Sequence, residues 1–496
     1  MYVSHFIGGE AYAGKTARSG PVFNPSTGEK SYDLSYADRA LVDHAVQVAA
    51  RAGKLWGDTS QARRLGVMFR MRELLIANTD KLAELVGVEN GKTIADAKGE
   101  IGRALEAIEY ATSAAEVTKG EYSRNVGGGI DVFSIREPVG VVACIAPFNF
   151  PVMVPMMMAC MALAVGNAVI VKPSEKVPAA TFMLGQLWKE AGLPDGVWNA
   201  VNGDKEVVDA LLEHPLVPVI SFVGSTPVGE YIYQRGSSFN KRVAAYTGGK
   251  NHMIVMPDAD LEEAASAFVS AGYGSASQRC MAISLLLPVG QETADRLIEI
   301  LIPKIRGLHM GAYNDPKADF GAVVSAESRQ QVLAAMHKAV EDGATVLVDR
   351  HHEVAGQTGF YVGASLLDHV RPDMDIYRHE VFGPVRGIVR VADLDEAIRI
   401  TNDHEFGNGA VIYTRSGPAA HRFVAEVKAG MIGVNVAVPV PVGHHNFGGL
   451  RRSKFGDAHM FGPDAARFYT DAKTVSQRWA GVEATQTVSM AFPSNG

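Results

Sequence analysis

The cysteine in residues 274–284, GSASQRCMAIS, has the surroundings of a reactive thiol. Cys280 follows Arg279 directly, and the residues before it are small and polar rather than an apolar stripe. A neighbouring cation favours the thiolate, which is the nucleophilic form of cysteine. A lone cysteine is more often a buried core residue, but these polar neighbours favour a nucleophile. The other two cysteines, Cys144 and Cys160, lie in apolar patterns typical of a core.

Asn149 could stabilise the negative charge that thiol attack on a carbonyl creates. It lies between two phenylalanines and before a proline in residues 146–155, APFNFPVMVP. An amide held rigidly in such a turn can donate to a developing oxyanion. Asparagine in turns also bonds to its own backbone, and the sequence leaves both roles open.

Two strand ends could bind a dinucleotide, although the G-x-G-x-x-G fingerprint is absent. Residues 224–229, GSTPVG, follow an apolar strand and open a helix, so their backbone N–H groups could meet a phosphate. A structural N-cap is the commoner role of Ser and Thr there. At another strand end, Lys172 and Glu175 could bind ribose hydroxyls at the carboxyl edge of a parallel sheet, or form a solvated loop pair.

The rest of the chain predicts the elements that position these residues. Residues 40–118 repeat apolar positions at three- and four-residue spacing, which predicts helices, and residues 129–147 predict extended strands. Short apolar strands then alternate with helices. This alternation predicts an α/β fold with a parallel sheet that helices cover on both faces. Residues 248–250, GGK, are typical of a hinge into a second α/β unit, which ends at 431–436.

Composition and charge argue against several classes of partner. The chain has 496 residues, enough for two or three domains, and its 54 acidic residues exceed its 47 basic residues. This balance gives no reason to expect nucleic acid or an anionic membrane as a partner. The apolar run at 151–165 is too short to span a bilayer and predicts a buried helix, and the N-terminus lacks a secretory signal. Three cysteines form no disulfide framework and the histidines match no metal-ligand spacing, so we expect a cytoplasmic protein without a metal centre.

Seven stretches occur together in an order that resembles one known family. They are NPSTGE (24–29), PFNFP (147–151), GNAVIVKPSE (166–175), FVGSTPVG (222–229), GGKNHMIVMPDADLEEA (248–264), RCMA (279–282) and EVFGPV (380–385). The joint match covers nearly the whole chain and resembles the aldehyde dehydrogenase superfamily, most closely its CoA-acylating semialdehyde branch.

The resemblance implies a role for each matching residue. Cys280 matches the nucleophile, and Asn149 matches the oxyanion donor that acts beside the Cys280 backbone N–H. Glu175 would favour NAD over NADP, because a carboxylate near the ribose repels a 2′-phosphate. The implied cofactor-binding residues are Phe148, Lys172, Ser174, Glu175, Gly224, Ser225, Gly229, Glu380 and Phe382.

The resemblance also implies three domains and a homodimer or homotetramer. A Rossmann-type NAD-binding domain and an α/β catalytic domain would be joined by a small β oligomerisation arm. A strand predicted at 466–479 would leave the body, and residues 481–496 would form a loose tail. The implied boundaries are 1–118 and 139–248 for the NAD-binding domain, 249–445 for the catalytic domain, and 119–138 and 446–496 for the arm and tail.

One missing carboxylate becomes informative through this resemblance. Hydrolytic members carry Glu-Leu-Gly-Gly-Lys, whose glutamate activates the deacylating water, and this chain has Tyr246 and Thr247 in place of the first two residues. A neutral tyrosine is a poor base at pH 7, because its pKa lies near 10. A thioester on Cys280 would therefore wait for the thiol of CoA, which is a better nucleophile than water.

Two arginines would select an aldehyde that carries a carboxylate. Arg279 and Arg103 match the pair that grips the substrate carboxylate in the semialdehyde branch, and guanidinium groups bind carboxylates in bidentate fashion. Arg103 is equally compatible with a solvent-facing helix position. Residues 447–456, FGGLRRSKFG, are similar to the hydrolytic members instead and leave the exact aldehyde open.

The expected reaction is NAD-dependent oxidation of methylmalonate or malonate semialdehyde through a Cys280 thioester. Loss of CO2 and transfer to CoA would give propionyl-CoA or acetyl-CoA. Two alternatives remain: a hydrolytic NAD(P)-dependent enzyme that releases the free acid, and a catalytically idle structural or binding homologue. The joint presence of Cys280, Asn149, Lys172 and Glu380 argues against an idle protein, and product analysis with and without CoA separates the other two.

Overall fold

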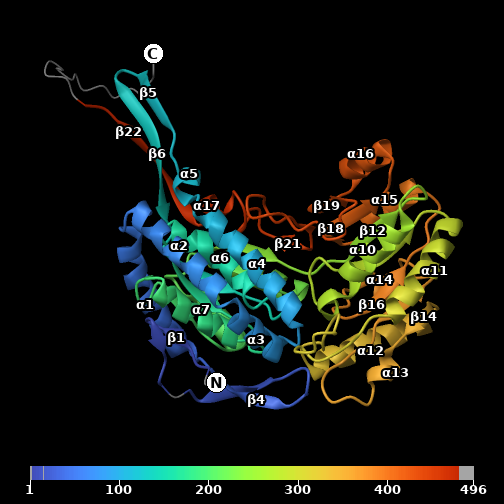
Figure 1. Ribbon diagram of the computed structural model, residues 1–496. Coiled ribbons are helices and arrows are strands. Elements are labelled where there is room, and N and C mark those ends of the chain that lie inside the picture. Colours follow the sequence, from blue (N-terminus) through green and yellow to red (C-terminus); the bar gives the residue numbers. More distant parts are fainter. Residues whose placement is uncertain (1–2, 15, 480–496) are drawn as a thin grey trace.

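The structure is a computed structural model that describes residues 3–14 and 16–479. Two large sheets form the body, and a narrow third sheet projects from it (Figure 1). The first large sheet has eight strands in the order β2-β1-β9-β8-β7-β10-β11-β21. Their bounds are β2 (Glu10–Ala11), β1 (Phe6–Ile7), β9 (Trp198–Ala200), β8 (Ala168–Lys172), β7 (Val141–Ile145), β10 (Val219–Val223), β11 (Arg242–Tyr246) and β21 (Lys454–Phe455).

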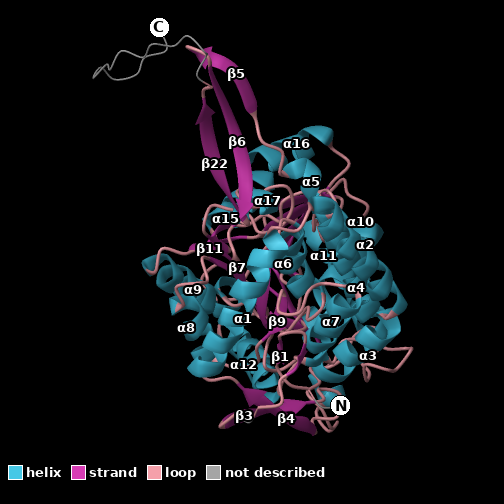
Figure 2. Ribbon diagram, turned by 90° about the vertical axis from the view of Figure 1, so that its left-hand side faces the viewer, coloured by secondary structure: helices cyan, strands magenta, loops and turns pink. Residues whose placement is uncertain are grey.

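The central strands of this sheet are parallel, as the strand–helix alternation predicts. Figure 2 shows α8 and α9 on one side of the sheet and α4 and α7 on the other. The run at 151–165 forms the buried helix α6, which confirms that prediction. The helices of this unit are α1 (Arg39–Gly57), α2 (Gln61–Ala77), α3 (Thr79–Asn90), α4 (Ile94–Ala111), α5 (Ala114–Val117), α6 (Met153–Ala164), α7 (Ala179–Glu190), α8 (Lys205–Glu213) and α9 (Thr226–Ser238).

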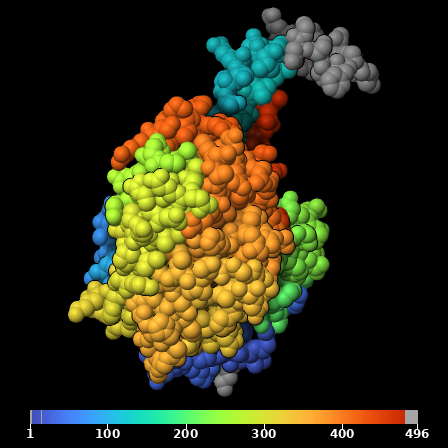
Figure 3. Space-filling model, turned by 90° about the vertical axis from the view of Figure 1, so that its right-hand side faces the viewer, coloured from blue at the N-terminus to red at the C-terminus, as the bar shows by residue number. Residues whose placement is uncertain are grey.

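The second large sheet has seven strands in the order β14-β15-β16-β13-β12-β18-β19. Its inner strands are parallel and buried along their length, and only the edge strand β14 is antiparallel. The strands are β12 (Asn251–Val255), β13 (Ile283–Pro288), β14 (Thr345–Asp349), β15 (Ser365–Asp368), β16 (Val385–Ile388), β18 (Gly409–Tyr413) and β19 (Met431–Val434). The helices are α10 (Leu261–Tyr273), α11 (Gln291–Arg306), α12 (Ala326–Glu341), α13 (His351–Val354), α14 (Asp375–Arg378), α15 (Leu394–Asp403) and α16 (Gly417–Glu426). Figure 3, which is viewed from the right-hand side of Figure 1, shows the yellow and orange surface of this unit over most of that face of the molecule.

The projecting sheet has three antiparallel strands in the order β22-β6-β5 (Figures 1 and 2). They are β5 (Tyr122–Gly127), β6 (Ile130–Pro138) and β22 (Thr470–Gln477), so the strand predicted at 466–479 is present after the short helix α17 (Ala465–Phe468). The tail predicted at 481–496 lies outside the described residues. Within those that are described, no helix is both long and apolar enough to cross a membrane.

Residues 446–464 do not join the projecting sheet, with which the implied boundaries group them. β21 pairs antiparallel with β11 at the edge of the eight-stranded sheet, and β20 (Leu450–Arg451) pairs with β17 (Phe406–Gly407). This segment therefore packs over the junction of the two units. A separate hairpin, β3 (Arg18–Phe23) with β4 (Lys30–Tyr36), completes the fold.

Candidate active site

A cavity of about 780 Å³ lies where the two units meet. The parallel strands β7, β8 and β10 end at this cavity, which is where open α/β sheets bind ligands. Gly229 lies behind it, where an added Cβ would stand 2.2 Å from a side-chain carbon of Thr247. The other predicted residues that line the cavity are Phe148, Asn149, Lys172, Ser174, Glu175, Gly224, Ser225, Cys280, Glu380 and Phe382.

The loop before Cys280 has an uncommon backbone conformation. Residues 275–277 all have positive φ angles, 58°, 49° and 61°, although none is glycine. Each such residue costs about 1–2 kcal/mol, so neighbouring contacts must hold the loop. The side-chain amides of Asn251 and Asn408 each donate to the Cys280 carbonyl at 2.9 Å. Sequence reasoning missed these two asparagines, since no motif distinguishes them from structural ones.

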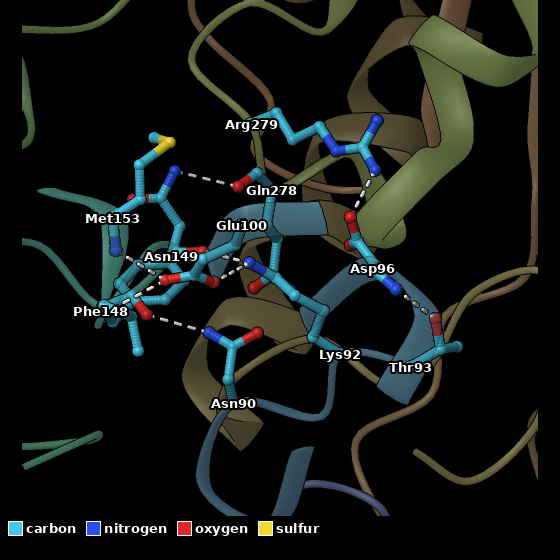
Figure 4. Close-up of polar contacts among 11 residues, drawn as sticks. Asn90, Lys92, Thr93, Asp96, Glu100, Phe148, Asn149, Met153, Gln278 and Arg279 are labelled. Atoms are coloured by element: carbon cyan, nitrogen blue, oxygen red, sulfur yellow. Dashed lines mark hydrogen bonds and ion pairs between the residues drawn. The ribbon is translucent and has the colours of Figure 1, made fainter. Parts of the chain in front are cut away.

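The thiol of Cys280 is not activated in the way that the sequence suggests. Burial, and to a smaller extent the nearby Glu380 carboxylate, raise its pKa to about 12. Arg279, expected to stabilise the thiolate, turns to Asp96 instead, with 2.7 Å between Nη2 and Oδ1 (Figure 4). The structure therefore does not place the Arg279 guanidinium beside the thiol, because Asp96, a carboxylate distant in sequence, binds it.

Asn149 contacts the cysteine loop rather than its own backbone. Its Nδ2 donates to the carbonyl of Gln278 at 2.9 Å, and the residue is buried (Figure 4). A side-chain amide has two N–H donors, so one remains for another acceptor. The side chain of Gln278 in turn accepts from the Val324 N–H at 3.0 Å, which ties the cysteine loop to a distant segment of the same unit. The structure thus brings Asn149 and Cys280 to one wall of the cavity.

The end of the large cavity that lies away from Cys280 has polar groups suited to a nucleotide. The Nζ of Lys172 lies 3.3 Å from Oε2 of Glu175. Burial alone would raise the pKa of Glu175, but Lys172 beside it brings that pKa below its usual value. Ser225 is the N-cap residue of α9, yet its hydroxyl makes no capping hydrogen bond and is exposed to the cavity. These groups fit ribose hydroxyls and a phosphate.

The opposite end of the cavity is more enclosed. An oxygen of Glu380 accepts from the Gly249 N–H at 3.2 Å, and burial raises the Glu380 pKa to about 7. Phe382 packs edge to face against Phe148, with 5.8 Å between ring centroids. A carboxylate and an aromatic pair beside Cys280 suit a ribose and a flat heterocycle.

Tyr246 lies at the end of β11 and is sequestered from the large cavity. Its hydroxyl donates to the Phe447 carbonyl at 3.0 Å and lies 2.8 Å from Nδ1 of His459. Its ring packs against those of Phe447 and Phe461. Burial raises its pKa above the usual tyrosine value. Tyr246 is therefore a neutral hydrogen-bond donor rather than a base.

The structure does not bring Arg103 and Arg279 to the same cavity. Arg103 lines a second, smaller cavity with Phe447 and Phe461, where it pairs with Glu106 at 2.6 Å and donates to the Pro441 carbonyl. Arg279 pairs with Asp96 at the start of the same helix, seven residues before Arg103. That separation is about 10 Å along the axis. Among the described residues, no group of three or more His, Cys, Asp or Glu is arranged to hold a metal.

A dinucleotide-sized cavity with a cysteine and a buried amide at its enclosed end defines a dehydrogenase that oxidises aldehydes. The chain belongs to the aldehyde dehydrogenase family, whose model matches residues 12–475.

Several relatives narrow the branch within this family. The malonate-semialdehyde dehydrogenase of Pseudomonas aeruginosa is 49% identical over 492 residues, 99% of each chain. That of Halalkalibacterium halodurans is 42% identical over 96% of this chain and 98% of its own. A protein from Sinorhizobium meliloti described as a methylmalonate-semialdehyde dehydrogenase, solved with NAD, has a TM-score of 0.96 at 46% identity, covering 98% of this chain and 99% of its own. The methylmalonate-semialdehyde dehydrogenase of Oceanimonas doudoroffii has a TM-score of 0.95 at 47% identity, covering 97% and 99%.

Proposed function

We propose that this protein oxidises malonate or methylmalonate semialdehyde with NAD and transfers the decarboxylated acyl group to CoA. The observation that carries the proposal is the buried, neutral Tyr246 at the position of the hydrolytic glutamate. The names of the relatives support the substrate, and the NAD in the Sinorhizobium structure supports the cofactor.

The chemistry begins at Cys280. Its thiol proton leaves to water, and the resulting thiolate adds to the aldehyde carbon. The carbonyl electrons form an oxyanion that accepts from the free N–H of Asn149 and from the Cys280 backbone. NAD, when bound, accepts the hydride that leaves this carbon, and a thioester remains. The β-carboxylate then departs as CO2, because the thioester carbonyl takes up the electron pair as an enolate, which is protonated. The CoA thiolate finally attacks the thioester and expels Cys280.

Polar residues of the large cavity would hold the cofactor. Lys172 and Glu175 would bind the adenosine ribose, and Glu380 the nicotinamide ribose. Ser225 and the first-turn N–H groups of α9 would face the pyrophosphate. Glu175 would disfavour NADP by charge repulsion. The remaining residues would pack against or shape the bound cofactor: Phe148, Ser174, Gly224, Gly229 and Phe382.

Removing CoA is expected to stop the enzyme after one turnover. General-base assistance contributes roughly 10²–10⁴-fold, so without it the acyl-enzyme should hydrolyse at least about 10²-fold more slowly than it transfers to CoA. NADH should appear as a burst of one equivalent per active site, followed by a slow phase that CoA accelerates. Mass spectrometry would identify acetyl-CoA or propionyl-CoA. Free acid formed equally fast without CoA would instead establish the hydrolytic alternative.

We propose that the smaller cavity, which Arg103 lines, receives the carboxylate of the substrate, so replacing Arg103 by leucine is expected to impair acidic substrates selectively. Loss of a charge-assisted hydrogen bond costs about 1.5–3 kcal/mol, so the KM for malonate semialdehyde should rise about 10- to 100-fold while that for propanal stays constant. Steady-state NADH formation with both aldehydes measures this difference. Arg72→Leu is the matched control, because Arg72 pairs with Glu109 outside the cavity. Equal changes for both aldehydes would remove Arg103 from substrate selection.

We also propose that the projecting sheet mediates assembly into a homodimer or homotetramer in the cytoplasm. Both β5 and β22 are edge strands, and Tyr122 on β5 is exposed. Unprotected edges tend to pair with another chain. The division into NAD-binding, catalytic and arm domains at 1–118/139–248, 249–445 and 119–138/446–496 remains a proposal, except for residues 446–464, which pair with strands outside the arm. A monomer in sedimentation velocity would contradict the assembly.

A further inference from the structure

A completely buried ion pair lies beside the loop that carries Asn149 (Figure 4). Nζ of Lys92, between α3 and α4, is 2.7 Å from Oε2 of Glu100 on α4, and both side chains have 0% exposure. Burying two charges costs several kcal/mol, and such a pair is weak support for stability on its own. Its hydrogen bonds to other groups therefore indicate what it does.

Lys92 and its neighbour Asn90 hold the backbone of the Asn149 loop. Nζ of Lys92 donates to the Asn149 carbonyl at 2.7 Å, and Nδ2 of Asn90 donates to the Phe148 carbonyl at 2.8 Å. The ammonium group also lies 4.0 Å from the centre of the Phe150 ring. Two consecutive carbonyls and an adjacent ring are thus held from one side.

Glu100 holds the other end of the same loop. Its Oε1 accepts from the N–H groups of Val152 and Met153, at 2.7 and 3.1 Å. These N–H groups belong to the start of α6, which has no side-chain cap of its own. A carboxylate there also complements the helix dipole. Because Glu100 bonds Lys92 through its second oxygen, the ion pair links α6 to the Asn149 carbonyl.

We propose that Lys92 and Glu100 are positioning residues that set the Asn149 amide relative to Cys280. The inference rests on the proposed oxyanion role of Asn149. With its main chain held by Lys92 and its side chain bonded to Gln278, Asn149 is held at both ends. Catalytic groups need placement within about 0.5 Å, and a misplacement of about 1 Å costs on the order of 10²-fold in rate.

The test uses the double variant Lys92→Met/Glu100→Gln in the full-length enzyme. Methionine fills the volume of lysine, and glutamine still accepts from Val152 and Met153, so both charges disappear together. Single-turnover NADH formation without CoA should slow about 10- to 100-fold, with the NAD dissociation constant unchanged by fluorescence titration. In an Asn149→Ala background the same two changes should slow it by less than about threefold, because residues acting as a unit are not additive.

Lys241→Met is the matched control. Lys241 is also buried and donates to two backbone carbonyls, those of His214 and Val217, each at 2.6 Å, but far from the cavity. It should lower the melting temperature and leave the NADH rate unchanged. Should the double variant not fold, Asn90→Ala disturbs the same loop by one neutral hydrogen bond. It should slow the rate less, and again without adding to Asn149→Ala.

Three results would overturn the positioning role. The first is a single-turnover rate of the double variant within about threefold of wild type. The second is a double-variant effect on this rate that is as large in the Asn149→Ala background as in wild type. The third is an equally slow rate in Lys241→Met. An Asn149→Ala enzyme as fast as wild type would be a different failure. It would remove the oxyanion role on which the inference rests and leave the Cys280 chemistry standing.

Discussion

Cys280→Ala is expected to abolish turnover while NAD still binds. Without the sulfur no thioester forms, and losing a covalent nucleophile costs on the order of 10⁴-fold or more. The substitution removes only the thiol, so the loop that Asn251 and Asn408 hold should keep its shape. NADH formation measures the first effect, and fluorescence titration with NAD measures the second.

Cys144→Ala and Cys160→Ala are the matched controls for Cys280. Both cysteines are completely buried, and burial raises the pKa of each thiol. Their replacement should cost some stability through small cavities and leave the activity near wild type. Activity near wild type in Cys280→Ala, or its loss in a control, would contradict the assignment. The first of these outcomes would show that oxidation does not pass through a thioester on Cys280.

Asn149→Ala is expected to slow acylation by about 10²–10³-fold, the usual cost of removing one oxyanion donor. The thioester should still form, because Cys280 is present. The NAD dissociation constant should change little, since the proposed partner of the amide is the aldehyde oxygen and not the cofactor. Rapid-mixing measurement of the NADH burst reports this step directly.

Asn167→Ala serves as the control for Asn149. Asn167 is fully buried and donates to the Ala162 and Tyr469 carbonyls at 3.0 and 2.9 Å, remote from Cys280. It should lower thermal stability without slowing the burst. Equal burst rates in wild type and Asn149→Ala would show that the amide only maintains the fold.

The alternation of elements is visible in the sequence because it depends on local patterns. The apolar run at 151–165 becomes α6, and the strand predicted at 466–479 becomes β22. The pairing of residues 450–455 is not visible in the sequence, because they form short strands whose partners, β17 and β11, lie far away in the chain. Strand pairing of this kind leaves no local periodicity.

The site was predictable where a motif specifies it and not where contacts cross the chain. Sequence motifs identify Cys280, Asn149 and Lys172, and the structure places all three in the lining of one cavity. Nothing around Arg279 indicates that Asp96, 183 residues away, binds its guanidinium. Lys92 and Glu100 are equally inconspicuous, because charges eight residues apart near a helix start usually face water.

The buried Tyr246 also decides what becomes of the free energy that aldehyde oxidation releases. Its hydroxyl is committed to the Phe447 carbonyl and His459, so the residue at the position of the hydrolytic glutamate is not a base that could deprotonate water. A hydrolytic enzyme would release the free energy of the thioester as heat when water cleaves it. In the proposed reaction the thioester on Cys280 is exchanged for a thioester on CoA, so the product would leave already activated, with no ATP required to activate it again.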